Sequence, residues 1–175
     1  MCYSCRREIA PTHSVLLTAD SLMWSDPDSA LLLLEQLSDV KQLKKADRAL
    51  YALLQTQAQY KNYVSLRNDS LIQIAVDYYE DNKDGERLAK SYFYQGCVYA
   101  EKKELPKAIE LYFMSLDKMP KGSDSIFIAM VYSHLGDCYS EQNLHSTART
   151  MYKNGYSLCI GNDSVRACYT LKDIG

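Results

Sequence analysis

The sequence predicts an all-α fold in which antiparallel helix hairpins stack into an α-solenoid. Composition is the first reason, because 175 residues contain only 7 Gly and 4 Pro but 15 Tyr, a balance that favours helices over a turn-rich β-sandwich. The second reason is an internal repeat, since a helix-turn-helix pattern at 89–120 returns at 129–160. Apolar residues make up 47% of the chain, which is enough to bury a core. We expect about nine helices in one solenoid domain at 13–175.

The N-terminal part is expected to form a short flexible segment at 1–12 and then two hairpins, at about 13–40 and 44–82. Apolar residues recur at helical spacing through both hairpins. Asp26 and Pro27 separate the two helices of the first hairpin, because a capping carboxylate followed by proline is typical of a helix start. These hairpins keep the apolar spacing of the later ones but little of their sequence.

The only tryptophan, Trp24, lies just before the turn of the first hairpin. We expect its ring to pack over that turn as part of the core. A ligand platform is the alternative role for this side chain.

The next hairpin, at about 86–119, carries the strongest signal. Tyr92, Gly96 and Tyr99 fall at i, i+4 and i+7, on one face of a helix. A glycine inside a helix costs about 1 kcal/mol relative to alanine, so we expect the backbone of the second helix to approach Gly96 closely. The second helix has an apolar face of its own, formed by Ala108, Leu111, Tyr112 and Ser115.

The same layout returns 40 residues later, in a hairpin at about 125–160. The residues Ala129, Tyr132, Leu135, Gly136, Tyr139, Ala148, Tyr152 and Gly155 occupy the positions of Ala89, Tyr92, Gln95, Gly96, Tyr99, Ala108, Tyr112 and Ser115. A further copy begins at 164–175 and stops at Gly175, so we expect an unfinished repeat that continues in a longer natural protein. Its apolar end at Leu171 and Ile174 favours association between chains.

Charge and reactive side chains give no sign of catalysis. A net charge of -2 and a pI near 5.9 disfavour nucleic-acid binding. The six cysteines are too scattered for a disulfide scaffold, and we expect Cys97 and Cys138 to be small buried residues. Cys159 and Cys168 flank a turn and could approach each other. The histidines are too far apart for a helical metal pair, so the sequence predicts no enzyme activity, no cofactor and no metal site.

The N-terminus has no apolar stretch long enough for a signal peptide or a membrane span. Cys2 and Cys5 form a lone CxxC, which is a weak signal for a metal or redox site. Cys5, preceded by Tyr3 and Ser4, also resembles the end of a bacterial lipoprotein signal whose apolar part is missing. The chain is therefore predicted to be soluble as given. A truncated start would place the natural protein in the periplasm or on a lipid anchor, and an intact start would place it in the cytoplasm.

The two strong hairpins resemble the tetratricopeptide repeat (TPR), a unit of about 34 residues with aromatic, Leu-Gly, Tyr, Ala, aromatic, Ala and Pro positions. The matching residues are Tyr92, Gly96, Tyr99, Ala108, Tyr112 and Pro120, then Tyr132, Gly136, Tyr139, Ala148 and Tyr152. Gln95, Ser115, Gly155 and Ile160 depart from the pattern. The resemblance implies a right-handed superhelix. Nearly the whole chain, including its degenerate first hairpins, is similar to the N-terminal helical-repeat region of bacterial TPR lipoproteins and membrane-tethered regulators.

The TPR resemblance implies a concave groove that takes a protein or peptide. By resemblance, the groove-facing residues are Lys90, Phe93, Cys97, Met130, Ser133, Asp137, Tyr169 and Lys172. Some TPR proteins clamp a C-terminal carboxylate there. In this chain Phe93 and Ser133 stand where a lysine is needed, and Cys97 and Asp137 stand where an asparagine is needed. The implied function is a non-catalytic scaffold within a larger regulatory or cell-envelope protein. The alternative is a ligand-sensing input domain of a membrane-bound transcriptional regulator.

Overall fold

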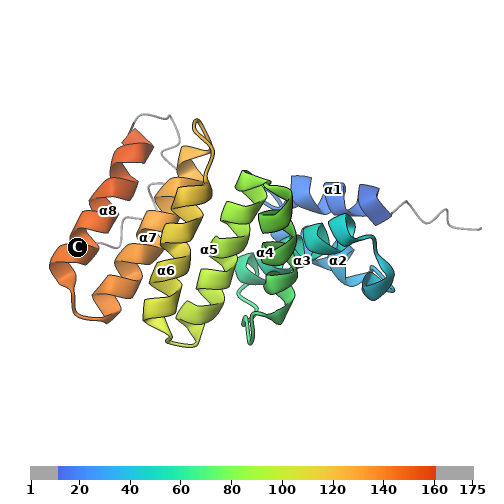
Figure 1. The fold of residues 1–175 in the computed structure, drawn as a ribbon, viewed down its shortest axis with the longest axis horizontal. Helices are drawn as coiled ribbons and strands as arrows, with labels where there is room; N and C mark the ends of the chain where they lie inside the picture. The colour runs from blue at the N-terminus through green and yellow to red at the C-terminus, as the bar shows by residue number, and fades with distance from the viewer. Residues whose placement is uncertain (1–11, 161–175) are drawn as a thin grey trace, which may run out of the picture.

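The computed structural model describes residues 12–160 and consists, over that range, of eight α-helices and one short 3-10 turn (Figure 1). The elements are α1 (Thr12–Leu22), α2 (Pro27–Glu35), η1 (Val40–Gln42), α3 (Lys45–Lys61), α4 (Ser70–Asn82), α5 (Gly85–Glu101), α6 (Leu105–Lys118), α7 (Ser125–Glu141) and α8 (His145–Ile160). The predicted segment 1–12, apart from its last residue, and the predicted repeat at 164–175 lie outside the described residues. The domain boundaries and the handedness of the superhelix stay predictions.

Consecutive helices pack in pairs, and the pairs stack in chain order (Figure 1). The helix α1 packs against α2, α3 against α4, α5 against α6, and α7 against α8. Neighbouring pairs meet where α2 contacts α3, α4 contacts α5, and α6 contacts α7. Each pair thus contacts mainly the pairs before and after it, which is the arrangement of a solenoid. The predicted all-α solenoid is confirmed.

The first helices of three successive pairs have the same length and a constant spacing. The helices α3, α5 and α7 are each 17 residues long and begin 40 residues apart, at Lys45, Gly85 and Ser125. A residue with left-handed backbone follows each helix, namely Tyr63 (φ 56°), Lys103 (φ 62°) and Asn143 (φ 61°). The amide after each of these donates to a carbonyl five residues back, at 2.9 Å, and so satisfies a free group of the helix end.

The helix α3 therefore belongs to the same repeat as α5 and α7. This register is not evident from the sequence, because α3 has Ala52 and Thr56 where α5 has Tyr92 and Gly96. The hydroxyl of Thr56 donates to the carbonyl of Ala52 at 2.8 Å, so this buried side chain is satisfied within its own helix. The repeat thus persists in backbone geometry where its characteristic residues are lost.

Side-chain caps fix the starts of several helices. Asp26 accepts a hydrogen bond from the Ser29 amide at 3.1 Å, and Pro27 is the first residue of α2, as the sequence predicts. Asp84 and Asp124 cap α5 and α7 in the same way. Because such a cap satisfies an otherwise free helical amide, each helix can begin directly after a short connection.

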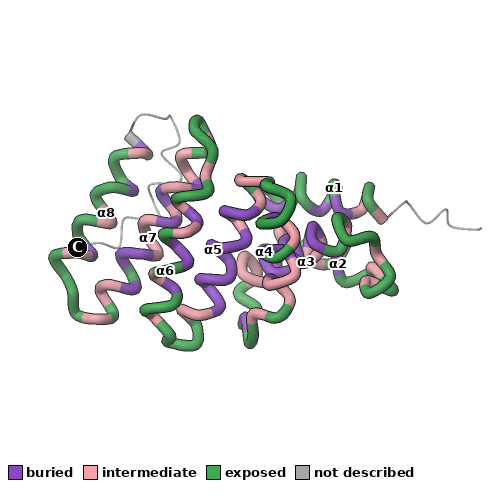
Figure 2. The backbone as a smooth tube through the Cα atoms, viewed as in Figure 1, coloured by how far each residue is buried: buried purple, intermediate pink, exposed green. Residues whose placement is uncertain are grey.

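The helix α3 lies between two clusters of buried side chains. Its Leu50, Leu54 and Ala58 pack with α1 and α2, whereas Ala52 and Leu53 join the larger cluster formed with α4, α5, α6 and α7. Buried positions consequently run along most of α3 and α5, while the turns at the helix ends are exposed (Figure 2). The first hairpin is thus attached to the rest of the solenoid largely through α3.

Candidate binding surfaces

The predicted groove positions on α5 are not open to a partner. Phe93 is 0% exposed and Cys97 is 3% exposed, so both belong to the core. Their assignment to a partner-binding surface is corrected accordingly. Lys90 remains partly exposed, but its Nζ lies 2.7 Å from a carboxylate oxygen of Glu86. In this conformation α5 offers Lys90 alone from the predicted set.

Phe93 is buried because it lies within a cluster of aromatic rings. The centroid of its ring is 5.0 Å from that of Tyr94, 5.3 Å from Phe127, 5.1 Å from His134 and 6.2 Å from Tyr60. Edge-on and tilted ring pairs at such distances are worth about 0.5–1.5 kcal/mol each beyond the burial of their area. Side chains from α3, α5 and α7 therefore occupy the position where a groove ligand was expected.

A hydrogen bond joins α3 to α7 beside this cluster. The hydroxyl of Tyr60 and Nε2 of His134 lie 2.8 Å apart, although the two residues are 74 positions apart in the chain. Burial lowers the pKa of His134, and the nearby carboxylate of Asp137 offsets this only in part. The ring is therefore neutral at pH 7, and its unprotonated nitrogen can accept a hydrogen bond from the Tyr60 hydroxyl.

The glycines of the repeat make room for a tyrosine ring rather than for a helix backbone. A Cβ atom on Gly96 would lie 2.6 Å from Cε1 of Tyr112. At Gly136 the same atom would meet the ring of Tyr152. At Gly96 the expected nearest neighbour, the backbone of the second helix, is therefore wrong, because the closest contact comes from the tyrosine side chain of that helix.

These two tyrosines also explain two of the predicted groove residues. Tyr112 donates a hydrogen bond to Sγ of Cys97 at 3.6 Å, and Tyr152 donates to Oδ1 of Asp137 at 2.8 Å. Cys97 and Asp137 follow Gly96 and Gly136 directly, so both hairpins use one arrangement. Each of these residues serves the fold, although Asp137 stays exposed.

The remaining predicted groove residues lie on α7 or beyond the described part of the chain. Met130 and Ser133 are partly exposed, and Met130 packs against the larger core cluster. Tyr169 and Lys172 lie outside the described residues. Together with Asp137, Met130 and Ser133 are the accessible groove positions of α7.

Potential metal ligands and cysteine thiols are the reactive groups of the described residues that can be assessed directly. No group of three or more potential ligands in this part of the chain is placed to hold a metal ion. Cys97 and Cys138 are buried, as predicted, and burial raises the pKa of both thiols, that of Cys138 to about 11. Such thiols stay protonated at neutral pH and are poor nucleophiles. None of the described helices is both long and apolar enough to cross a bilayer.

Exposed aromatic residues gather where the first hairpin meets α3. We call this surface the junction patch and define it as Trp24, Lys61, Tyr63 and Val64. Trp24 is 57% exposed, Tyr63 is 97% exposed, and Val64, which follows Tyr63 in the chain, is 43% exposed. Nζ of Lys61 lies 3.5 Å from the centroid of the Trp24 ring. The expected packing of Trp24 over its turn is therefore wrong.

The position of the junction patch follows from the end of α3. Nδ2 of Asn62 donates to the carbonyl of Pro27 at 2.9 Å, which holds the C-terminus of α3 against the turn that follows Trp24. Tyr63 must take left-handed backbone to end the helix, a conformation that is costly for a bulky residue. Sequence reasoning missed this patch because its parts come from turns with no periodic pattern.

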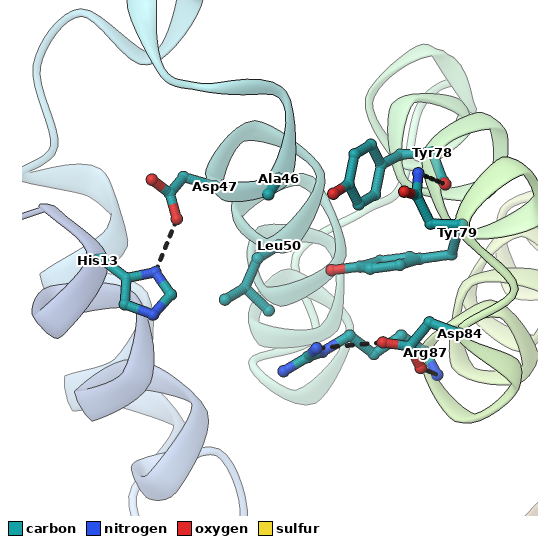
Figure 3. Close-up of a pocket in the computed structure, with 9 residues that line it drawn as sticks. His13, Ala46, Asp47, Leu50, Tyr78, Tyr79, Asp84 and Arg87 are labelled. Carbon is teal, nitrogen blue, oxygen red and sulfur yellow. Dashed lines mark hydrogen bonds and ion pairs between the residues drawn. The ribbon is translucent and has the colours of Figure 1, made fainter.

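A cavity of about 220 Å³ lies between α1, α3, α4 and the start of α5 (Figure 3). His13 and Asp47 form one wall and share a hydrogen bond of 2.7 Å between Nδ1 and Oδ1. Tyr78, Tyr79, Asp84 and Arg87 form the opposite side, where Arg87 pairs with Asp84 at 3.1 Å. Sequence analysis did not bring these residues together, because they come from four helices and their connections.

Comparisons with known proteins support the fold only. No family model and no curated protein matches the sequence. The chain is similar to the solved apo form of RapI, with a TM-score of 0.65 and 14% identity over 92% of this chain and 44% of RapI. It is also similar to MamA 41-end from Desulfovibrio magneticus RS-1, with a TM-score of 0.39 and 15% identity over 87% of this chain and 97% of MamA. The chain thus spans less than half of RapI, whose TPR-like helical repeats support the same fold here.

Proposed function

We propose that this chain is a non-catalytic scaffold that binds a protein or peptide partner through the junction patch. The observation that carries the proposal is the exposure of Trp24, Tyr63 and Val64 at the place where Lys61 and Asn62, at the end of α3, contact the first hairpin. Tryptophan and tyrosine are the residue types that contribute most at protein interfaces, because they bury a large rigid area and keep one polar atom. The same proposal includes that the chain is the recognition part of a larger regulatory or cell-envelope protein.

The accessible groove residues form a second candidate surface for the same function. Lys90, Met130, Ser133 and Asp137 are the members of the predicted set that remain accessible, and they lie on successive first helices. Tyr169 and Lys172 would extend this surface in the proposal. We rank it below the junction patch because Lys90 and Asp137 already have partners within the chain.

Affinity capture followed by a measured dissociation constant tests the proposal. The purified partner is titrated against wild type and three variants: Trp24→Ala with Tyr63→Ala, Lys90→Glu with Asp137→Lys, and Phe113→Ala. Phe113 is a matched control, since it is an exposed aromatic residue on α6, away from both surfaces.

We expect the first variant to lose at least tenfold in affinity at an unchanged melting temperature, while the control binds as wild type does. Loss in the Lys90 and Asp137 variant alone would move the site to the groove. A chain that captures no partner, or partners that bind all three variants equally, would refute the scaffold function on these surfaces.

The alternative function is a ligand-sensing input domain of a membrane-bound transcriptional regulator. The cavity at His13 and Arg87 favours the ligand-sensing part of this alternative. Tyrosine side chains and paired charges line a cavity of about 220 Å³ there, which is smaller than the about 300–1,000 Å³ of sites for drug-sized ligands and would admit only a smaller molecule. The output half, a membrane-bound transcriptional regulator, stays a prediction from resemblance.

A further inference from the structure

The last residues of α3, α5 and α7 occupy the same position in successive repeats. They are Lys61, Glu101 and Glu141, because the three helices are each 17 residues long and begin 40 residues apart. Oε2 of Glu101 accepts a hydrogen bond from the Leu66 amide at 2.8 Å, and Glu141 pairs with Nζ of Lys103 at 2.8 Å. Each glutamate thus has a polar partner in the connection of the preceding hairpin.

Lys61 makes the corresponding contact with an aromatic ring. Its Nζ lies 3.5 Å from the centroid of the Trp24 ring, and Trp24 lies in the connection between α1 and α2. The face of the ring attracts an ammonium group, but it carries no negative charge. No carboxylate among the described residues forms an ion pair with Lys61. At this position the repeat therefore has a positive charge without a counter-ion, where the next two repeats have a paired negative charge.

Lys61 is also partly withdrawn from water. Its side chain is half-buried, and burial lowers the pKa of its ammonium group. A partly desolvated charge gains more from a counter-ion than a fully hydrated one does, because the effective dielectric constant around it is lower. A carboxylate from outside the chain would supply the charge that the described residues do not.

Accessible apolar side chains accompany this charge. Trp24, whose ring contacts Lys61, is exposed, and so are Tyr63 and Val64, which follow Lys61 closely in the chain. Exposed aromatic area contributes affinity to an interface, whereas a countercharge contributes specificity. A partner that brings a carboxylate together with an apolar side chain matches both features.

We propose that the junction patch binds a segment of a partner protein in which an aspartate or glutamate stands next to an apolar residue. The carboxylate of this segment pairs with the ammonium group of Lys61, and the apolar side chain lies against the ring of Trp24. This inference rests on the proposed function and adds the chemistry of the partner.

The test uses the whole chain and a library of random peptides displayed on phage. Peptides are selected on the wild type, synthesised with amidated C-termini and titrated against the wild type, Lys61→Met and Trp24→Ala, whose melting temperatures are measured alongside. We expect the selected peptides to carry an aspartate or glutamate next to an apolar residue. Lys61→Met keeps an unbranched side chain but removes the charge, so it should bind these peptides at least tenfold more weakly.

A second change, in the peptide, shows whether its carboxylate meets Lys61. Replacing the acidic residue of the peptide by its amide should weaken binding to the wild type about tenfold, but it should leave binding to Lys61→Met unchanged. Lys102→Met is the matched control, because Lys102 also lies over a ring, with Nζ 5.0 Å from the centroid of Tyr99, at the end of α5. This variant should bind the peptides as the wild type does.

Failure of the proposed function and failure of this inference give different results. If no peptide is selected, or if Trp24→Ala binds the selected peptides as tightly as the wild type does, the junction patch is not a binding surface for such segments and both are overturned. If Trp24→Ala loses binding but the selected peptides lack acidic residues, only the chemistry assigned to the partner is overturned. The same holds if Lys61→Met and Lys102→Met bind the peptides equally well.

Discussion

The helices α5 and α7 have the same length and the same place in their repeats, yet the predicted groove face is buried on α5 and accessible to solvent on α7. At one matched position α5 has Phe93, which is fully buried, and α7 has Ser133, which is partly exposed. At the next matched position the pair is Cys97, which is buried, and Asp137, which is exposed. The comparison shows that the repeat fixes the position of a residue on its helix, whereas packing of the neighbouring helices determines whether its side chain is exposed to solvent.

The reason for the difference lies in what covers each helix. Tyr60 from α3 and His134 from α7 both contact Phe93, so α5 is covered from both neighbours. The helix α7 contacts α6 on one side and its own partner α8 on the other. A face that is accessible to solvent in one repeat can therefore be core in the preceding repeat.

The largest expected effect comes from removing the buried ring of this comparison. Phe93→Ala should lower the free energy of unfolding by about 3–5 kcal/mol, because it leaves a cavity among aromatic rings. Ser133→Ala, at the matched position, should change it by less than about 0.5 kcal/mol. Urea denaturation of both variants measures the difference. Similar losses at the two positions would show that the faces are equally buried.

Substitution of the matched glycines Gly96 and Gly136 by alanine extends the comparison of α5 with α7. Gly96→Ala should cost about 1–3 kcal/mol, because the added methyl group displaces the buried ring of Tyr112 and this outweighs the better helix propensity of alanine. Gly136→Ala should cost less, since the ring of Tyr152 is only partly buried and can move outward. Thermal unfolding compares the two variants, and an unchanged or raised stability of Gly96→Ala would rule out the close ring contact.

A third pair extends the comparison to α3. Gln55 and Gln95 occupy matched positions, but Oε1 of Gln55 is buried with no hydrogen-bond partner among the described residues, whereas Nε2 of Gln95 donates to Gln73 at 2.6 Å. Gln55→Met removes an unsatisfied group and should leave stability unchanged or raise it by up to about 1 kcal/mol. Gln95→Met breaks a bond and should cost about 1 kcal/mol. Denaturation midpoints that fall equally would contradict this account.

The smallest effect concerns pH. Burial holds the pKa of His134 below its ordinary value of 6.5, so the unfolded chain binds this proton more readily than the folded one. The contribution of His134 is therefore fully present above pH 6.5, and stability falls as the pH drops through 6.5 towards the folded pKa. In His134→Gln this part of the decline should disappear, while His145→Gln, an exposed control, should keep it. Melting temperatures measured across this interval decide between the two results.

Sequence reasoning could predict the hairpins because their signals are local. Helical spacing, the turn at Asp26 and Pro27, and the paired glycines Gly96 and Gly136 all act within one hairpin. The role of the glycines could be predicted only in part. Their spacing indicates a close contact, but it does not show that a tyrosine ring makes that contact. The register of α3 was missed because its evidence is backbone geometry at Tyr63.

The binding surfaces could not be predicted, because they depend on contacts between distant parts of the chain. The burial of Phe93 requires Tyr60 and His134 to meet across 74 positions. The cavity at Tyr79 requires α1 to lie opposite α4 and α5. The repeat pattern of a single sequence predicts which residues share a face of a helix. It does not show which of these faces a neighbouring element covers.

Chemical labelling of Cys97 tests the central claim most directly, namely that α3, α5 and α7 fill the predicted groove with their own side chains. A variant that keeps Cys97 as its only cysteine is exposed to a thiol-reactive disulfide reagent under native conditions and in urea. The native thiol should react many times more slowly than the unfolded one, because it is buried and its pKa is raised. Equal rates in the two conditions would mean that this face is open, and the groove would again be the first candidate for partner binding.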